Sequence, residues 1–232
     1  MDFSNKKLAI LFRVGDANVY LTNTLVSTWT IGLVLIALAF VLRLMYMKRY
    51  QDAPASGSLQ NVLELAVETM SNFVTSTLGH NLTGLGGYFF GVFVFIIISN
   101  FSALVGLRPP TADLSTTLAL ALNTFFLTHF LGITRQQGEY FKEYVNPVFI
   151  FLPIHLIGEI SKPISLSFRL FGNILGGVII LGLLYKALPI LLRFAVPDVL
   201  HLYFDLFAGS LQAYIFTILS MTYIRSKAEG SE

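Results

Sequence analysis

Apolar stretches long enough to cross a membrane recur along the chain and alternate with short polar segments. A spanning helix needs about 20 such residues, and in lipid the backbone is satisfied by helices rather than by open sheet. The pattern predicts an all-α, polytopic membrane protein with about five membrane-crossing helices, one amphipathic interfacial helix and no strands. We expect a single membrane domain, residues 1–232, made of an N-terminal segment 1–21, a first span 22–47, an amphipathic helix 58–79, a helical hairpin 88–107 and 113–134, and two long, strongly tilted helices 145–189 and 197–226.

The segment 58–79 carries an apolar stripe on one helical face and an acidic polar stripe, with Glu64 and Glu68, on the other. Such a helix lies along an interface or packs against a partner. Its negative face makes adhesion to anionic lipid the weaker option. Ser58, at the end of the linker 52–58, is a candidate N-cap.

The segment 145–189 is too long for a single perpendicular crossing. As one helix it would measure about 60 Å, roughly twice the hydrocarbon thickness. It either breaks near Pro153 or Pro163 or tilts strongly in the membrane. Tilt is favoured, because the polar positions keep one helical phase from His155 to Asn173.

Ionisable and amide side chains interrupt both of the last two segments at helical spacing. At about 100° per residue, five polar residues of the first segment fall within roughly 40° of one line and so share one helical face. They are His155, Glu159, Lys162, Arg169 and Asn173. In the second segment, four polar residues at offsets of 0, 3, 7 and 14 also share one helical face. They are Asp198, His201, Asp205 and Gln212. A charge at the bilayer centre costs at least ~2.5–3.5 kcal/mol on insertion scales, so these residues indicate function.

Composition supports a membrane protein and narrows the chemistry. Hydrophobic residues make up 55% of the chain and charged residues 12%, with a net charge of +2 and no cysteine. Neither the charge nor any basic cluster suggests a nucleic-acid partner. No phosphate-binding loop with Lys and Ser or Thr occurs, and the pair His155 and Glu159 lacks a third metal ligand. We expect neither a cofactor nor a resident metal.

Two helices with polar seams can enclose water-accessible half-channels for a cation. An arginine at the narrow point stays protonated at any ordinary pH, so Arg169 can repel cations and attract a carboxylate without relaying a proton. Glu159, Asp205 and His201 are groups that can shuttle protons.

Three motifs carry a resemblance to a known family. Residues 161–174 (SKPISLSFRLFGNI) resemble the signature of subunit a of the rotary F-type ATP synthases, in its bacterial form. Residues 211–216 (LQAYIF) are similar to its second signature, and residues 110–122 (PTADLSTTLALAL) to its motif at the start of the fourth helix.

The resemblance implies an ion-translocating stator subunit, without nucleotide chemistry of its own, beside a rotating ring of c subunits and b-type peripheral stalk subunits. Arg169 matches the essential arginine that faces the ring carboxylate and separates two half-channels. Asn173 and Gln212 match polar residues close to it, and Asp205 falls where the family has a group serving the outer half-channel. The resemblance also implies a bacterial plasma membrane. Basic residues weakly favour a cytoplasmic C-terminus and an outside N-terminus.

The chain departs from the family at Val178, where an ionisable residue often follows the arginine by nine positions. The outer path would then rely on Asp205, His201 and Asp113, and the transported ion, H⁺ or Na⁺, stays open.

Simpler interpretations exist for some of these residues. Glu159 and Lys162, about one turn apart, can neutralise each other, and Asp113 can be only a helix N-cap. For the whole chain, a self-contained secondary cation transporter is the alternative, against which stand the missing internal repeat and the few spans. An intramembrane hydrolase would need a nucleophile and base that the sequence does not offer.

Overall fold

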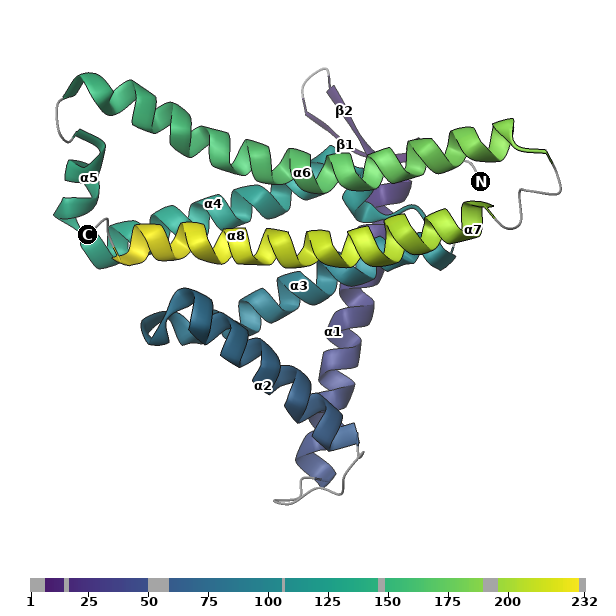
Figure 1. Cartoon of the computed structure of the whole chain (residues 1–232), viewed down its shortest axis with the longest axis horizontal. Helices are drawn as coiled ribbons and strands as arrows, with labels where there is room; N and C mark the ends of the chain where they lie inside the picture. The colour runs from purple at the N-terminus through teal and green to yellow at the C-terminus, as the bar shows by residue number, and fades with distance from the viewer. Residues whose placement is uncertain are drawn as a thin grey trace.

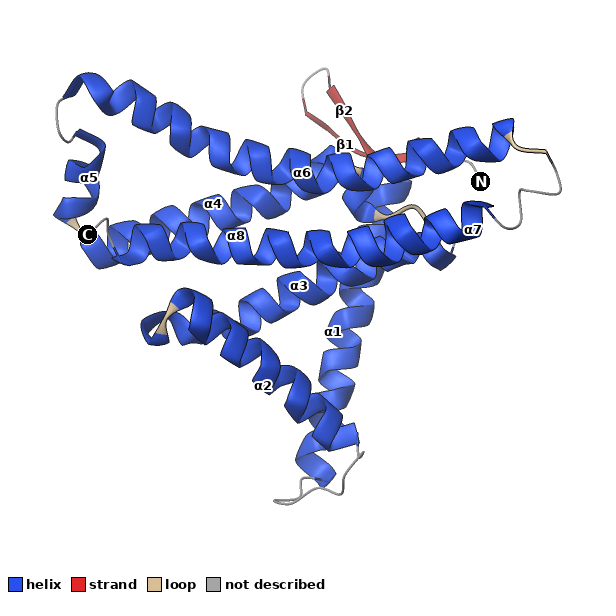
Figure 2. Cartoon of the chain, in the orientation of Figure 1, coloured by secondary structure: helices blue, strands red, loops and turns tan. Residues whose placement is uncertain are grey.

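The computed structural model describes residues 7–14, 17–49, 59–105, 107–145, 149–189 and 196–229. Its helices are α1 (Asn23–Arg49), α2 (Leu59–Leu78), α3 (Gly86–Phe101), α4 (Leu114–Gln136), α5 (Gly138–Val145), α6 (Leu152–Ala187), α7 (Val196–His201) and α8 (Gly209–Glu229). Short 3-10 turns occur at His80–Leu85, Ser102–Val105, Pro110–Ala112 and Phe149–Phe151. Helices make up nearly all of the described chain (Figure 2). The predicted helical class is therefore confirmed.

The number of crossing helices also agrees with the prediction. By length and apolarity, 5 helical stretches could cross a membrane: Asn23–Met45, His80–Val105, Leu114–Gln136, Phe149–Ala187 and Val199–Glu229. The amphipathic α2 is not among them, because its polar side chains lower its hydropathy.

α4, α6 and α8 form a bundle, shown in Figure 1. α6 runs one way and α7 with α8 run back, and α4 packs against both α6 and α8. α3 and α2 both lie against α8, and α2 also contacts α3. The C-terminus, α5 and the start of α6 lie together at one end, which we call the C-terminal end of the bundle.

Two buried clusters hold the bundle together. The first joins α2, α3 and α8 through residues such as Val74, Phe89 and Ile224. The second joins α3, α4, α6 and α8 through Ile96, Ala121, Leu166, Leu170, Ala213 and Phe216. Because lipid is as apolar as these side chains, close packing rather than the hydrophobic effect favours their association.

The N-terminal segment is not free of strands, so that prediction is wrong. β1 (Lys7–Val14) and β2 (Ala17–Thr22) form an antiparallel hairpin that precedes α1 in the chain and is visible at the top of Figure 1. The sequence contains a signal for it, since Gly-Asp separates two runs rich in β-branched and aromatic residues. The hairpin passes directly into α1, where the hydroxyl of Thr22 accepts a hydrogen bond from the backbone N–H of Leu25 at 3.3 Å.

The C-terminal part of the chain differs from expectation at two helix starts. The polar loop after α4 contains a short helix, α5, and the turn between them has a positive φ of 50° at Gln137. α6 begins at Leu152 rather than near 145, with Pro153 in its first turn, where no N–H is needed. The linker 52–58 with the candidate cap Ser58 lies outside the described residues.

α6 continues through Pro163 without a break, as favoured from the sequence. Its 36 residues correspond to about 54 Å, which exceeds the hydrocarbon thickness and fits a tilted crossing. The last helical run is less regular than predicted, because residues Leu202–Ala208 between α7 and α8 are π-helical. Such insertions are frequent at functional sites.

Candidate functional site

Arg169 lies on the outer surface of α6, and its side chain is exposed. The residues around it fix this direction, because Leu166 and Leu170 are buried against Ala213 and Phe216 of α8. The guanidinium therefore leaves the bundle on the face that the rest of the chain does not cover.

Gln212 of α8 lies opposite Arg169. The amide of Asn173 donates to the carbonyl of Ala208 at 3.3 Å, and one helical turn further along each antiparallel helix come Arg169 and Gln212. Gln212 is 6% exposed, and its amide nitrogen has no hydrogen-bond partner within the described part of the chain. An unpaired buried amide costs about 1–3 kcal/mol, so Gln212 is a polar group held inside the bundle at an energetic cost.

Towards the end of the bundle that lies opposite its C-terminal end, His201 and Asp205 form a close pair. The imidazole Nδ1 and the carboxylate Oδ2 lie 2.6 Å apart, with 17% and 8% of the side chains exposed. Asp205 belongs to the π-helical segment, and Phe204 next to it packs against Gly177 of α6. We call Arg169, Asn173, Asp205 and Gln212 the α6–α8 seam.

The π-helical segment changes the predicted alignment of the last helix. The offsets that place His201 and Asp205 on one line with Gln212 assume an unbroken α-helix, whereas each π turn holds about one residue more. That extra residue rotates the rest of the helix by about 100°. Asp205 and Gln212 are nevertheless both buried, and the side chain of Asp198 lies outside the described residues.

The segment is held from α3 by a residue that sequence reasoning missed. The amide of Asn100 donates to the carbonyl of Gly209 at 2.9 Å and accepts from the hydroxyl of Thr111 at 2.6 Å. Both Asn100 and Thr111 are buried. An amide at the end of an otherwise apolar run was the available signal for such a contact.

Glu159 lies towards the C-terminal end of the bundle in a group that we call the lysine cluster, Glu159, Lys162 and Lys227. One carboxylate oxygen of Glu159 lies 2.8 Å from the ammonium of Lys162 and 3.0 Å from that of Lys227. The predicted neutralisation of Glu159 by Lys162 is thus present. Lys227 was not predicted as a partner, because in sequence it looks like a basic residue in a polar tail.

Tyrosines of α5 complete the surroundings of this cluster. The hydroxyl of Tyr140 lies 2.5 Å from Nδ1 of His129 and 2.9 Å from the hydroxyl of Tyr144. Burial and the hydrogen bond with Tyr144 raise the pKa of Tyr140, so its hydroxyl stays protonated. Nδ1 of His155 lies 3.0 Å from the carbonyl of Tyr144, which ties the start of α6 to α5.

Buried hydroxyls of α4 lie between these two regions. Thr117 contacts Ser167 of α6 at 3.1 Å, two residues before the arginine. Thr124 contacts Ser220 of α8 at 3.3 Å, and it lines a small cavity with Glu159. The hydroxyls thus join the level of Arg169 to the lysine cluster along the inside of the bundle.

Asp113 lies at the N-terminus of α4. Its carboxylate caps that helix, accepting from the backbone N–H of Ser115 at 3.4 Å and from its hydroxyl at 3.1 Å. Val178 is half-buried on α6. Among the described residues, no group of three or more acidic, histidine or cysteine side chains could hold a metal ion.

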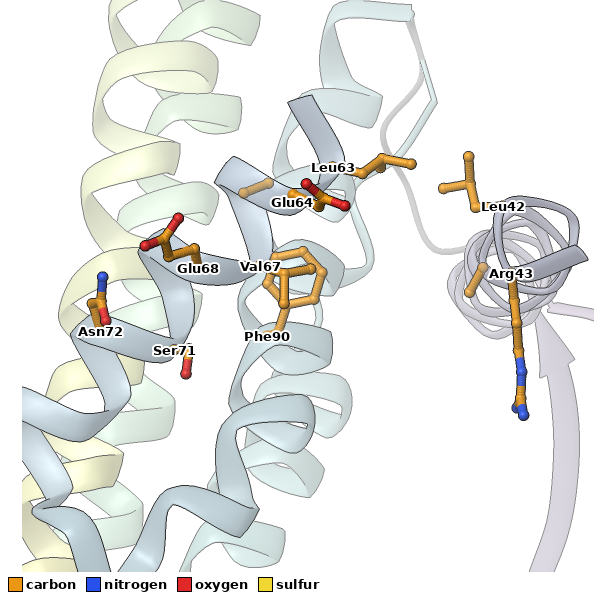
Figure 3. Close-up of a pocket in the computed structure, with 11 residues that line it drawn as sticks. Leu42, Arg43, Leu63, Glu64, Val67, Glu68, Ser71, Asn72 and Phe90 are labelled. Atoms are coloured by element: carbon orange, nitrogen blue, oxygen red, sulfur yellow. The ribbon is translucent and has the colours of Figure 1, made fainter. Parts of the chain in front are cut away.

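A groove of about 650 Å³ lies away from the seam, between α1 and α2 (Figure 3). Phe90 of α3 forms part of its wall, and Glu64 and Glu68 of α2 border it. None of the seam residues contributes to it.

Comparison with known proteins shows the family of the chain. The family model described as ATP synthase A chain matches residues 25–225. An ATP synthase subunit a from Trichlorobacter lovleyi is 32% identical over 234 residues, which cover 99% of this chain and 96% of the relative. An ATP synthase subunit a from Moorella thermoacetica is 32% identical over 223 residues, 95% of this chain and 96% of the relative.

A third relative carries an ion in its name. The sodium ion specific ATP synthase subunit a from Propionigenium modestum is 42% identical over 159 residues, 61% of this chain and 53% of the relative. The family match covers all four seam residues and all five candidate spans, apart from the ends of the first and last. The chain therefore belongs to the ATP synthase A chain family, the ion-translocating membrane subunit a of the F-type ATP synthase.

Proposed function

We propose that the chain provides two aqueous half-channels that pass a cation to and from carboxylates on a rotating c-ring, with Arg169 separating them. The observation that carries this proposal is the exposed guanidinium on an apolar face, opposite the buried and unpartnered amide of Gln212. A permanent charge there needs an anionic partner. The partner lies outside the chain, since the bundle leaves this face uncovered.

The outer half-channel runs along the opposite end of the bundle from the C-terminus. His201 and Asp205 can pass a proton across 2.6 Å, and Asn173 lies between this pair and Arg169 along α6. The cap Asp113 remains a candidate for the outer entrance, because Val178 provides no ionisable group.

The inner half-channel runs from the arginine level towards Glu159. The hydroxyls of Thr117, Ser167 and Thr124 support this course, since they are polar groups inside an apolar bundle. We propose that the C-terminal end of the bundle, with the lysine cluster, faces the cytoplasm of a bacterial cell and that the N-terminus lies outside.

The proposal includes b-type peripheral stalk subunits as further partners and either H⁺ or Na⁺ as the ion. The relative named for sodium makes Na⁺ a direct candidate. Pumping measured with each ion present alone decides between them.

ATP-driven ion pumping in inverted membrane vesicles tests the proposal. We expect Arg169→Ala to assemble normally and to abolish pumping, because ions then pass between the half-channels without turning the ring. The matched control is Arg225→Ala, which removes an arginine paired with Glu229 on the surface. Pumping by assembled Arg169→Ala at the wild-type rate would refute the proposal.

Copurification with the c-ring separates the proposal from the secondary transporter. A self-contained transporter would move its ion in liposomes without any ring. Transport by the chain alone would support that alternative.

A further inference from the structure

We propose that the ammonium group of Lys227, paired with the carboxylate of Glu159, repels the transported cation in the inner half-channel and so limits the rate of ion passage. This inference rests on the proposed function of the chain as an ion path. It concerns a residue of the last turns of α8 that the sequence motifs do not include.

The site around Lys227 is built to hold an ammonium group. Only 5% of its side chain is exposed, and its Nζ lies 3.0 Å from the carboxylate of Glu159. The same Nζ lies 4.5 Å from the ring centre of Tyr144 and 5.8 Å from that of Tyr140. A carboxylate and aromatic faces together are the groups that stabilise a desolvated ammonium.

The backbone of Lys227 is fixed as firmly as its side chain. The amide of Gln136 donates to the carbonyl of Lys227 at 2.9 Å. Gly132 of α4 leaves room for that carbonyl, since a β-carbon there would lie 3.1 Å from it. The ammonium is therefore directed into the bundle rather than free in solvent.

Lys162 does not duplicate this role. It binds the same carboxylate oxygen, but 33% of its side chain is exposed. Lys162 is thus a partly solvated ion-pair partner of Glu159, and Lys227 is a desolvated one. With two ammonium groups and one carboxylate, the lysine cluster carries one excess positive charge. His129 and His155 are the titratable groups nearest to the cluster through Tyr140 and Tyr144.

The excess charge opposes cations at this place. A cation that passes between α4 and α6 meets Glu159 already paired with two ammonium groups, so the site attracts it less than a bare carboxylate would. A unit charge about 6 Å from a cation, even when screened as in bulk water, changes the local cation concentration by about threefold, which is the smallest effect to expect near the desolvated Lys227. Lys227 is therefore a rate-setting residue of the inner path.

Passive ion conductance of the intact membrane sector, after removal of the ATP-hydrolysing part, tests the inference. Lys227→Met keeps the length of the side chain and removes its charge, and Glu159 retains Lys162 as its partner. We expect a rise in conductance of about threefold or more. Lys227→Arg restores the charge and should conduct like the wild type, and so should the surface control Arg225→Met.

The outcomes separate the inference from the proposed function. Unchanged conductance in assembled Lys227→Met overturns the inference, while loss of pumping in Arg169→Ala still supports the half-channels. Equal loss of conductance in Lys227→Met and Lys227→Arg would show that Lys227 only stabilises the structure, and it would overturn the inference as well. If Lys227→Met does not assemble, Lys227→Gln is measured, and failure of both to assemble also counts against the inference.

Discussion

Asp205 is a buried carboxylate whose described side-chain partner is a histidine one turn before it. Burial without a permanent cation makes a carboxylate costly unless its charge is shared or it binds a proton. A neighbouring imidazole can take or give that proton. These properties make the pair the candidate for proton exchange on the outer path proposed above.

We expect Asp205→Asn to lower ATP-driven pumping by about tenfold or more, because the amide cannot exchange a proton with His201. Assembly should be preserved, since asparagine has nearly the same shape and can still hydrogen-bond the imidazole. The control is Ser210→Ala, which removes an exposed hydroxyl bonded to the carbonyl of Leu206. Full pumping by Asp205→Asn would exclude Asp205 from the path.

Individual residues differ in how far the sequence reveals them. Arg169 could be recognised because a charge in an apolar run is costly and its motif is specific. Lys227 could not, because a lysine in the polar tail after the last long apolar run ordinarily lies in solvent. Its burial depends on α5, whose tyrosines meet α8 only in the folded chain.

At the scale of elements, α4 holds the last two helices together. Small or hydroxylated residues are buried along its inner face, and Gly132 is one of them. A β-carbon there would lie 2.8 Å from the ring of Tyr140. Because Gly132 has no side chain, the ring of Tyr140 can pack directly on α4, and α5 covers the C-terminal end of the bundle.

Gly132→Ala should therefore destabilise the bundle by about 1–3 kcal/mol, because a packed interior accommodates an added methyl group only by moving its neighbours. Thermal denaturation of the purified complex in detergent measures the effect as a lowered midpoint. The matched substitution is Gly91→Ala on α3, where nothing lies within 4 Å of the added carbon. Equal midpoints for the two variants would contradict the packing argument.

The elements show what periodicity can and cannot predict. Long apolar runs predicted the crossing helices, because length and hydropathy alone determine what fits a bilayer. The π-helical segment Leu202–Ala208 was not predictable from a fixed period of 3.6 residues. Its position is set by contacts with other elements, Asn100 on α3 and Gly177 on α6.

At the scale of the whole molecule, large apolar side chains are exposed on the last two helices near Arg169. They include Phe168 on α6 and Leu211 on α8. A surface of this kind fits a protein partner that supplies the missing negative charge.

Cysteine cross-linking tests where the ring lies. The chain has no cysteine, so Ser165→Cys, one turn before Arg169 and exposed, provides a single thiol on this face. We expect it to form a disulfide with a cysteine introduced near the ring carboxylate. Ile36→Cys, on the exposed side of α1, should form none. A disulfide from Ile36→Cys and none from Ser165→Cys would contradict the placement of the ring against the face that carries Arg169.

α1 differs from the other spans in how little of it is buried inside the chain, 6% of its most apolar stretch against 28–33% for the others. Most of its side chains meet only what surrounds the protein, and lipid requires apolar area rather than a particular shape. Leucine, isoleucine, valine and phenylalanine should therefore exchange there over evolutionary time, while Gly132 and the seam keep their identities. Among relatives, differences in α1 should therefore reflect how long ago two chains diverged, whereas the residues at the contact between α6 and α8 should be kept by selection.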